Sequence, residues 1–446
     1  MSDNKLRRLP LAAAALLVCF GAQADYTSPD GKFRMSGFGT LGVAKTNNDE
    51  VKFNYPGQGG GASKDYSIHP DSKVAIQGTQ TFTNTVSATA QIMTKYDAEG
   101  DYIPKFEWAF AKWQAMPGLN IRAGRMGAPY FMISDFRDVG YANTPVRPNL
   151  DVYGQVPVSS FDGVDVSYQF NLGSATLTST LWTGNSKADF ANTLTSAGTP
   201  TDPVSVEIKR TVGLNLLAEF DNGLSIRFGH AGGKLTVGSP TTNSLIAAAQ
   251  QLGAFGLSAE DQAGVGSLLT RDSKASFTGI GLAYDQNDIV LATEFTKRKN
   301  ERGIVADTTG WYFMGGYRFG SFLPYVSWSR VKVDDSNGAA PSFASAGTVI
   351  TNSGGAAAPA LQQLIGGTTA SFNTQKLTQR TISAGVRWDV ASGFALKAQF
   401  DHVRKPANSA GMFLVPDAAV EVATGQQFVG NRKNVNVVTL SVDFVF

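Results

Sequence analysis

The final segment of the chain constrains its fold more than any other feature. From Asn436 to Phe446 apolar and polar residues alternate, and the chain ends on that phenylalanine. Successive side chains of a β-strand point to opposite faces of the sheet, so a strand here would have one apolar and one mostly polar face. The apolar face would carry Val438, Leu440, Val442, Phe444 and Phe446. This pattern favours the closing strand of a β-barrel that is embedded in lipid.

Residues 1–24 have the pattern of a secretory signal peptide. Lys5, Arg7 and Arg8 give a basic start, Leu9 to Phe20 an apolar run, and Ala22-Gln23-Ala24 a cleavage motif. We expect cleavage after Ala24 and export into the periplasm. The apolar run of about 12 residues is too short for a membrane-anchoring helix, which needs about 20. A lipoprotein signal ending at Cys19 is disfavoured because Val18 stands where a small residue is expected.

Composition after cleavage excludes several classes of protein. Cleavage would remove Cys19, which is the only cysteine, so no disulfide, thiolate metal site or cysteine nucleophile would remain. It would also remove Asp3, Lys5, Arg7 and Arg8, so 38 basic residues become 35, 36 acidic residues become 35, and the net charge falls from +2 to zero. A nucleic-acid partner would require a strong basic excess, so we expect none.

Alternation between turn residues predicts about sixteen strands along the chain. We expect them near 31–44, 73–82, 86–96, 106–115, 119–125, 163–171, 174–183, 206–220, 223–232, 274–286, 288–299, 309–320, 322–333, 376–390, 393–405 and 432–446. Beyond the signal no apolar run approaches 18 residues, which argues against membrane-spanning helices. Helical patterns are confined to a capping box at 258–261, a helix-permissive stretch at 244–252, and a segment rich in small residues at 338–370.

The connections between these strands alternate in length. The short ones lie near 83–85, 116–118, 172–173, 221–223, 287–288, 320–321 and 391–393, and they are rich in Gly, Asn and Asp. The long ones lie near 45–72, 97–105, 126–162, 184–205, 233–273, 300–308, 334–375 and 406–431. Short turns at one rim and long loops at the other are typical of outer-membrane β-barrels. A soluble sandwich does not require this regularity, so we predict an all-β transmembrane antiparallel barrel of about sixteen strands.

With these features the chain resembles the Gram-negative outer-membrane general-diffusion porins of the sixteen-stranded class. The resemblance covers residues 25–446 and rests on the Ala22-Gln23-Ala24 motif, the strand and loop alternation, Phe446 and the long third loop. It implies a homotrimer of barrels in outer-membrane lipid, each with its own water-filled pore. It also implies a passive channel for ions and small hydrophilic solutes, without a cofactor, in which the third loop folds inward to narrow the lumen.

The third loop is expected at 126–162, and its charges define the candidate site. The resemblance implies that acidic loop residues face basic wall residues across a narrow water gap, which filters ions by an electrostatic barrier. The loop acids would be Asp135, Asp138 and Asp151, and the wall bases would be Arg34, Lys73, Lys95 and Arg122. Arg125 would join the wall bases if a bulge at Gly124 turned it inward. Arg137 and Arg147 depart from a purely acidic loop and argue against strong cation selectivity. An ordinary surface loop is the alternative interpretation.

Other charges on the expected inner face are more often basic than acidic. The bases are Lys32, Lys209, Arg227, Arg298, Arg318, Arg387 and Lys397, and the acids are Glu107, Asp165, Glu219, Glu294, Asp401 and Asp443. We therefore predict a weak preference for anions. The alternative is a substrate-specific channel with a saturable lumen site for phosphate, a dicarboxylate or an aromatic acid.

An enzyme and a closed structural barrel are less consistent with the sequence. The three histidines, His69, His230 and His402, are not placed to act as a catalytic base. The chain contains no G-x-S-x-G, H-E-x-x-H or P-loop motif. The spaced glycines of Met35 to Gly42 lie within a strand, where they suit barrel curvature or tight packing better than phosphate binding. A structural barrel would need only eight strands, whereas sixteen leave an aqueous channel.

Overall fold

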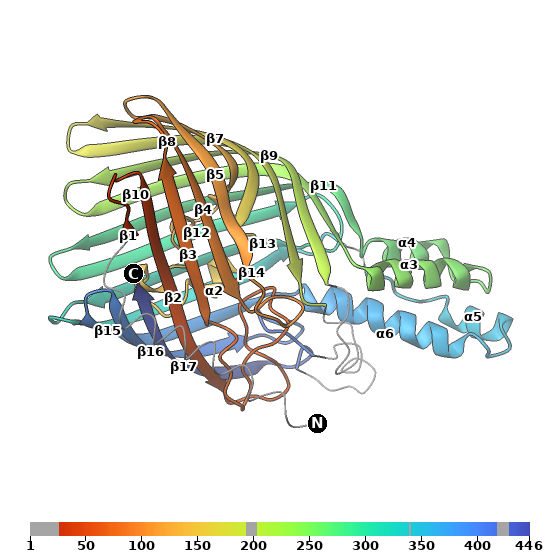
Figure 1. Cartoon of the computed structure of the whole chain (residues 1–446). Coiled ribbons are helices and arrows are strands. Elements are labelled where there is room, and N and C mark those ends of the chain that lie inside the picture. Colours follow the sequence, from red (N-terminus) through yellow and green to blue (C-terminus); the bar gives the residue numbers. More distant parts are fainter. Residues whose placement is uncertain (1–25, 193–202, 339, 417–427) are drawn as a thin grey trace.

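The structure is a computed structural model that describes residues 26–192, 203–338, 340–416 and 428–446. The signal peptide predicted for residues 1–24 lies outside them. Sixteen long strands, β2 to β17, form a closed antiparallel barrel (Figure 1). Each strand pairs with its neighbours in the chain, and β17 pairs with β2 to close the wall. A short strand, β1 (Tyr26–Thr27), pairs with the start of β2. The predicted fold class is therefore confirmed.

The strands carry alternating side chains throughout the wall. Their bounds are β2 (Phe33–Thr46), β3 (Lys73–Thr81), β4 (Val86–Lys95), β5 (Lys105–Met116), β6 (Leu119–Gly127), β7 (Ser160–Leu172), β8 (Ala175–Phe190), β9 (Val204–Phe220), β10 (Leu224–Gly238), β11 (Thr270–Gln286), β12 (Ile289–Asn300), β13 (Asp307–Tyr317), β14 (Phe322–Asp335), β15 (Gln379–Ala391), β16 (Phe394–Lys405) and β17 (Lys433–Val445). All sixteen predicted strands are present. The largest differences are at β8, β10 and β11, which extend four to seven residues further toward the long loops than predicted.

Burial distinguishes an outer face from an inner face of the barrel. In β12, Leu291 and Phe295 are 38% and 50% exposed, whereas Glu294 between them is 1% exposed. The same alternation recurs in β7, where Val164 and Val166 are exposed and Asp165 is buried. We call the face with exposed apolar side chains the outer face and the opposite one the inner face. An apolar outer face is what a barrel in contact with lipid requires.

Residues near the C-terminus complete the wall by packing against β2. The backbone N–H of Phe446 donates to Gly37 O at 2.9 Å, and the N–H of Gly37 donates back to Phe446 O at 2.6 Å. A Cβ atom at Gly37 would lie 2.3 to 2.8 Å from the Phe446 ring. The absence of a side chain at this position therefore lets the ring lie flat on β2. Gly39 accommodates the ring of Phe444 in the same way, whereas Gly42 lies against Asp71.

The two rims of the barrel differ as predicted. At one rim the strands are joined by tight turns, such as Asn287 and Asp288 with φ of 54° and 64°, a conformation that Asn and Asp tolerate. At the other rim four helices project beyond the wall (Figure 1): α3 (Pro240–Gly253), α4 (Ala259–Gly266), α5 (Ala346–Asn352) and α6 (Ala358–Thr374). Ser258 caps α4 by accepting a bond from the N–H of Asp261. The reciprocal bond of the predicted capping box is not formed, because the N–H of Ser258 donates to Ser345 Oγ instead of to the Asp261 carboxylate. Among the described residues, none of the helices has the length and apolar character needed to cross a membrane.

Candidate functional site

The segment between β6 and β7, residues 128–159, is the third loop of the predicted site. It is shorter than predicted because β6 extends to Gly127 and β7 begins at Ser160. It contains a turn of 3-10 helix, η1 (Gly140–Ala142), and a short helix, α2 (Leu150–Tyr153). Asn149 caps α2, since its side chain accepts a bond from the N–H of Asp151. The loop thus has a defined backbone path despite its length.

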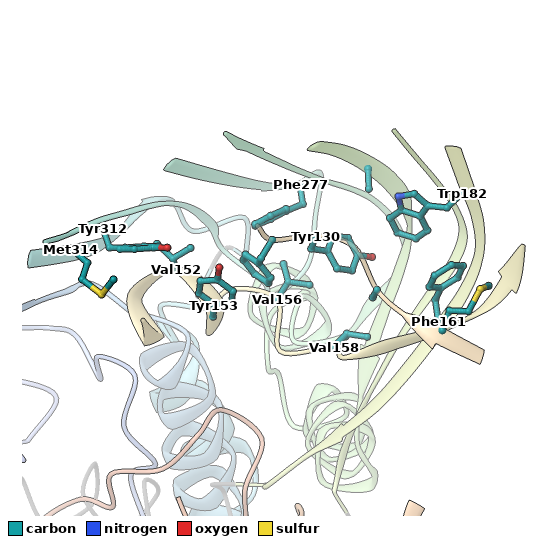
Figure 2. Packing of buried hydrophobic residues seen from close by; sticks show 14 of the residues in the cluster. Tyr130, Val152, Tyr153, Val156, Val158, Phe161, Trp182, Phe277, Tyr312 and Met314 are labelled. Atoms are coloured by element: carbon teal, nitrogen blue, oxygen red, sulfur yellow. The ribbon is translucent and has the colours of Figure 1, made fainter. Parts of the chain in front are cut away.

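Aromatic side chains pack the third loop against distant strands. Phe131 stacks on Tyr153 at 4.5 Å between ring centroids and meets Phe277 of β11 edge-on at 5.0 Å. Tyr130 contacts Trp182 of β8 edge-on at 5.5 Å. Figure 2 shows the cluster as a continuous row from Trp182 and Phe161 through Tyr130 and Phe277 to Tyr153, Tyr312 and Met314. These contacts remove large apolar surfaces from water, which stabilises the position of the loop.

Basic side chains of the inner face donate hydrogen bonds to carbonyl groups of the third loop. Lys397 Nζ in β16 lies 2.7, 2.6 and 3.0 Å from the carbonyl oxygens of Gly140, Asn143 and Pro145. Three further arginines act in the same way. Arg387 donates to Tyr141 O at 2.6 Å, Arg298 to Gln155 O at 2.6 Å, and Arg227 to Tyr130 O at 3.1 Å. Much of the basic wall predicted from the sequence therefore binds the loop backbone.

Asp151 is buried where the third loop meets β14 and β15. Gln379 Nε2 and Ser329 Oγ each donate to its carboxylate at 2.7 Å, and Thr381 Oγ1 donates at 3.3 Å. Burial raises the pKa of Asp151 to about 6, although the three hydrogen bonds act in the opposite direction. Asp151 thus anchors the loop, and it is 1% exposed.

Arg147 joins the third loop to two other parts of the chain. Its Nε and one terminal nitrogen donate to the two oxygens of Asp71, each at 2.7 Å, in a bidentate pair. It also donates to Asp401 of β16 at 3.1 Å and to Thr439 of β17 at 2.7 Å. Arg147 is 5% exposed. The ion pair is therefore buried, and neither Asp71 nor Asp401 was among the site residues predicted from the sequence.

Asp138 is the loop acid that meets the predicted wall bases. Lys73 Nζ lies 3.1 Å and Lys95 Nζ 3.5 Å from its carboxylate oxygens, and Arg137 Nε lies at 3.8 Å. Burial would raise the pKa of Asp138, but the charges of Lys95, Lys73 and Arg137 outweigh it and hold the pKa well below its usual range. Lys95 also lies 3.9 Å from Glu107. These opposite charges are in direct contact instead of facing one another across water.

Asp135 and the remaining wall bases are more dispersed. Asp135 is exposed and lines a small cavity together with Glu107 and Asp138. Arg122 lies on the inner face, with Nε 3.0 Å from both oxygens of Asp165 in the neighbouring strand. Arg34 is exposed and lies four residues before Phe38 in β2, about 13 Å along the strand. Phe38 is the residue in this part of β2 that packs against Val139 of the third loop.

The prediction that Arg125 turns inward is wrong. Arg125 pairs with Asp162, with two nitrogen–oxygen distances of 2.8 Å, and Asp162 lies on the same face of β7 as the exposed Val164. The pairing of β6 with β7 runs without a shift from Leu119 to Gly127. Gly124 therefore introduces no bulge, and Arg125 keeps the outward orientation that its position relative to Arg122 dictates.

Comparison with solved structures identifies the fold. No family model matches the chain, and no curated protein matches its sequence. The structure titled Salmonella typhi OmpF in complex with daunomycin is similar, with a TM-score of 0.51, 12% identity, and coverage of 95% of this chain and 100% of that chain. The anion-selective porin from Comamonas acidovorans has a TM-score of 0.50 and 12% identity, with 93% and 99% covered. At such low identity the likeness establishes the fold alone, which is that of the sixteen-stranded porins.

Proposed function

We propose that this protein is a porin of the bacterial outer membrane, a passive aqueous channel for ions and small hydrophilic solutes. The observation that carries the proposal is the closed wall of sixteen strands with an exposed apolar outer face. A barrel of that size is too wide for its own wall side chains to fill, so water occupies the lumen. The strand pattern is that of a wall between lipid and water, and the fold is that of the porins.

We further propose that the third loop lies within the lumen and forms the constriction. Its partners support this, because Glu294, Lys397 and Asp401 all belong to the inner face, opposite exposed apolar residues such as Phe295 and Phe400. Met132 N–H and Tyr153 O–H donate to the two oxygens of Glu294 at 3.0 and 2.8 Å. These bonds to side chains of the inner face support a position of the loop inside the wall.

The ion-paired charges around the loop favour a weak preference for anions. Lys73, Lys95 and Arg137 surround Asp138 and Glu107, so this ion-paired group of five carries one net positive charge. Asp135, which lines the same small cavity but belongs to none of these ion pairs, opposes that charge. The Arg122–Asp165 pair contributes no net charge. The similar structure from Comamonas acidovorans is described as anion-selective, which agrees with this sign.

We also propose that the barrel is a homotrimer and not an enzyme. The trimer follows from the resemblance to general-diffusion porins. The histidines support a non-catalytic role, because His230 Nδ1 lies 2.8 Å from Thr278 Oγ1 and His402 Nδ1 lies 2.6 Å from Asn436 Oδ1. The ring of His69 stacks on Tyr96 at 3.8 Å. Gel mobility before and after boiling tests the trimer, and a band that always runs as a monomer would contradict it.

Planar-bilayer recording tests the channel and its constriction. Purified protein should insert from detergent and give stepwise currents. These currents should increase with salt concentration, and small sugars should not block them in a saturable way. Shortening the third loop between 136 and 146 should raise the conductance of each step. Absence of steps from correctly folded protein would refute the channel. Unchanged conductance and selectivity after shortening would show that the loop does not form the constriction.

A further inference from the structure

A cavity of about 320 Å³ lies beside the third loop, at the rim of the barrel that carries the long loops. It is bounded by residues 154–158 of the third loop, the ends of β9 to β12 nearest that rim, and segments 54–58 and 411–414. Its volume falls within the range of small-molecule sites, roughly 300 to 1,000 Å³. The cavity is separate from the Asp138 cluster, whose residues are not among those that line it.

The lining of this cavity is mainly apolar. Its apolar residues include Val156, Val158, Leu235, Val237, Phe277 and Met412. The first five are each at most 8% exposed, so they form a fixed wall. Ions gain no binding free energy from such a surface. A solute with an apolar body would bury area here and gain binding free energy.

Three polar residues of β12 belong to the lining: Arg298, Lys299 and Asn300. Lys299 is exposed and has the parity of the outer face, like Phe295. Arg298 and Asn300 are two residues apart, so they share one face of the strand. Arg298 donates to the carbonyl oxygens of Ala306, at 3.2 and 2.9 Å, and of Gln155, at 2.6 Å. These bonds use three of its five N–H groups and leave its positive charge without a directly bonded carboxylate in the described part of the chain.

Asn300 has an unmet hydrogen-bonding capacity in the same place. It is 4% exposed, and its Nδ2 donates to Arg302 O at 2.7 Å and to Val305 O at 3.1 Å. Its Oδ1 accepts no hydrogen bond from the described residues. A buried acceptor without a partner is costly, and a ligand that supplies a donor would satisfy it. Asp307 on the next strand is already bonded to the backbone N–H of Asn300 and to Asn337.

We propose that this cavity binds apolar monocarboxylic acids, with the apolar body against Val156, Leu235 and Phe277 and the carboxylate on Arg298. A hydroxyl beside the carboxylate would donate to Asn300 Oδ1. Phosphate and dicarboxylates match this lining poorly, because among the described residues that line it Arg298 is the only cation on the inner face, and the apolar area is large. This inference rests on the proposed channel function and specifies one class of solute that the channel takes up.

Calorimetric titration of the detergent-solubilised mature protein tests the inference, with 3-phenyllactate as the probe. We expect saturable binding of 3-phenyllactate, weaker binding of 3-phenylpropionate, which lacks the hydroxyl, and no saturable binding of succinate or phosphate. Arg298→Gln should lower the affinity for 3-phenyllactate at least about tenfold, because it removes a charge-assisted hydrogen bond to the carboxylate. Leu235→Trp places a larger ring in the cavity, at the expected position of the apolar body, and should weaken binding of 3-phenyllactate strongly.

Ile226→Trp is the matched control, because it places the same side chain on the outer face of the same strand. It should bind 3-phenyllactate like the parent protein. Equal affinity in the Leu235→Trp variant and its control would overturn the inference, as would equal saturable binding of succinate. Channels that conduct but never bind 3-phenyllactate would refute the cavity site alone, whereas absence of channels would refute the proposed function.

Discussion

At the scale of single residues, Asp151 couples the third loop to pH. Its pKa is raised from 3.8 to about 6 by burial, so the folded protein binds a proton more tightly than the unfolded chain. The resulting stabilisation is fully present below pH 4 and is lost as the pH rises through 6. Its size is at most about 3 kcal/mol, from roughly two pKa units.

Asp151→Asn should remove this dependence, because the amide cannot ionise. We expect the variant to lose less stability than the parent protein between pH 4 and pH 7. Thermal unfolding midpoints in detergent, followed by circular dichroism at both pH values, measure the difference. A variant whose midpoints change with pH as much as those of the parent would contradict the assignment.

Arg147 provides a second prediction at this scale. Arg147→Met keeps an unbranched apolar stem but removes the guanidinium group, and so leaves Asp71 and Asp401 as buried carboxylates without their cation. We expect a loss of about 3 to 5 kcal/mol in the free energy of unfolding. Arg125→Met is the matched control, because it breaks an exposed pair with Asp162 that is worth at most about 1 kcal/mol. Comparable losses in the two variants, measured by denaturant titration, would contradict a buried role for Arg147.

Contacts of single residues were only partly predictable from the sequence. Alternation places Lys73 and Lys95 on the inner face, and both contact Asp138 directly, whereas the resemblance implied a water gap between them. Asp71 carries no comparable signal, because it precedes β3 in a long loop and has no strand periodicity. Gln379 is an uncharged residue at the first position of β15, and only the path of the third loop brings it to Asp151. Such contacts depend on loop geometry that no periodic pattern encodes.

At the scale of elements, periodicity predicted the strands well because lipid and water impose opposite demands on successive residues. The ends of β10 and β11 were missed, since Gly232 and Gly233 interrupt the apolar pattern although the pairing continues to Val237 and Thr270. The bounds of helix α6 could not be predicted from the sequence either, because its segment is dominated by small residues. It forms where Leu361 and Leu364 share an apolar cluster with Leu245 of α3.

Close approach of β7 and β8 gives a prediction for these elements. A Cβ atom at Gly163 would lie 2.0 Å from the backbone oxygen of Thr183 and 2.7 Å from Gly184 Cα, so the two strands would have to separate. Gly163→Ala should therefore cost about 1 to 3 kcal/mol. Gly315→Ala is the control, because its nearest neighbour would lie 3.5 Å away. Equal unfolding midpoints for the two variants would show that β7 and β8 can move apart freely.

For the whole molecule, the decisive question is which charges the permeating ions meet. The barrel itself was predictable, since sixteen alternating segments with loops of alternating length admit few other folds. The sign of the ion selectivity was harder to predict. Several basic residues of the inner face bind carbonyl groups of the third loop and are not simply charges that line the pore: Arg227, Arg298, Arg387 and Lys397. The charge balance therefore depends chiefly on the group around Asp138.

Asp138→Asn tests this balance directly. The change leaves Lys73, Lys95 and Arg137 with one acid, Glu107, and raises the net charge of the group from one to two. A unit charge at 4 Å is worth about 1 kcal/mol in water, so the chloride-to-potassium permeability ratio should rise by up to roughly fivefold. The zero-current potential in a potassium chloride gradient measures it, and the shift should shrink as salt screens the charges. Asp162→Asn on the outer face is the control and should leave the potential unchanged. If both variants give the parent potential, the Asp138 group does not face the path of the ions.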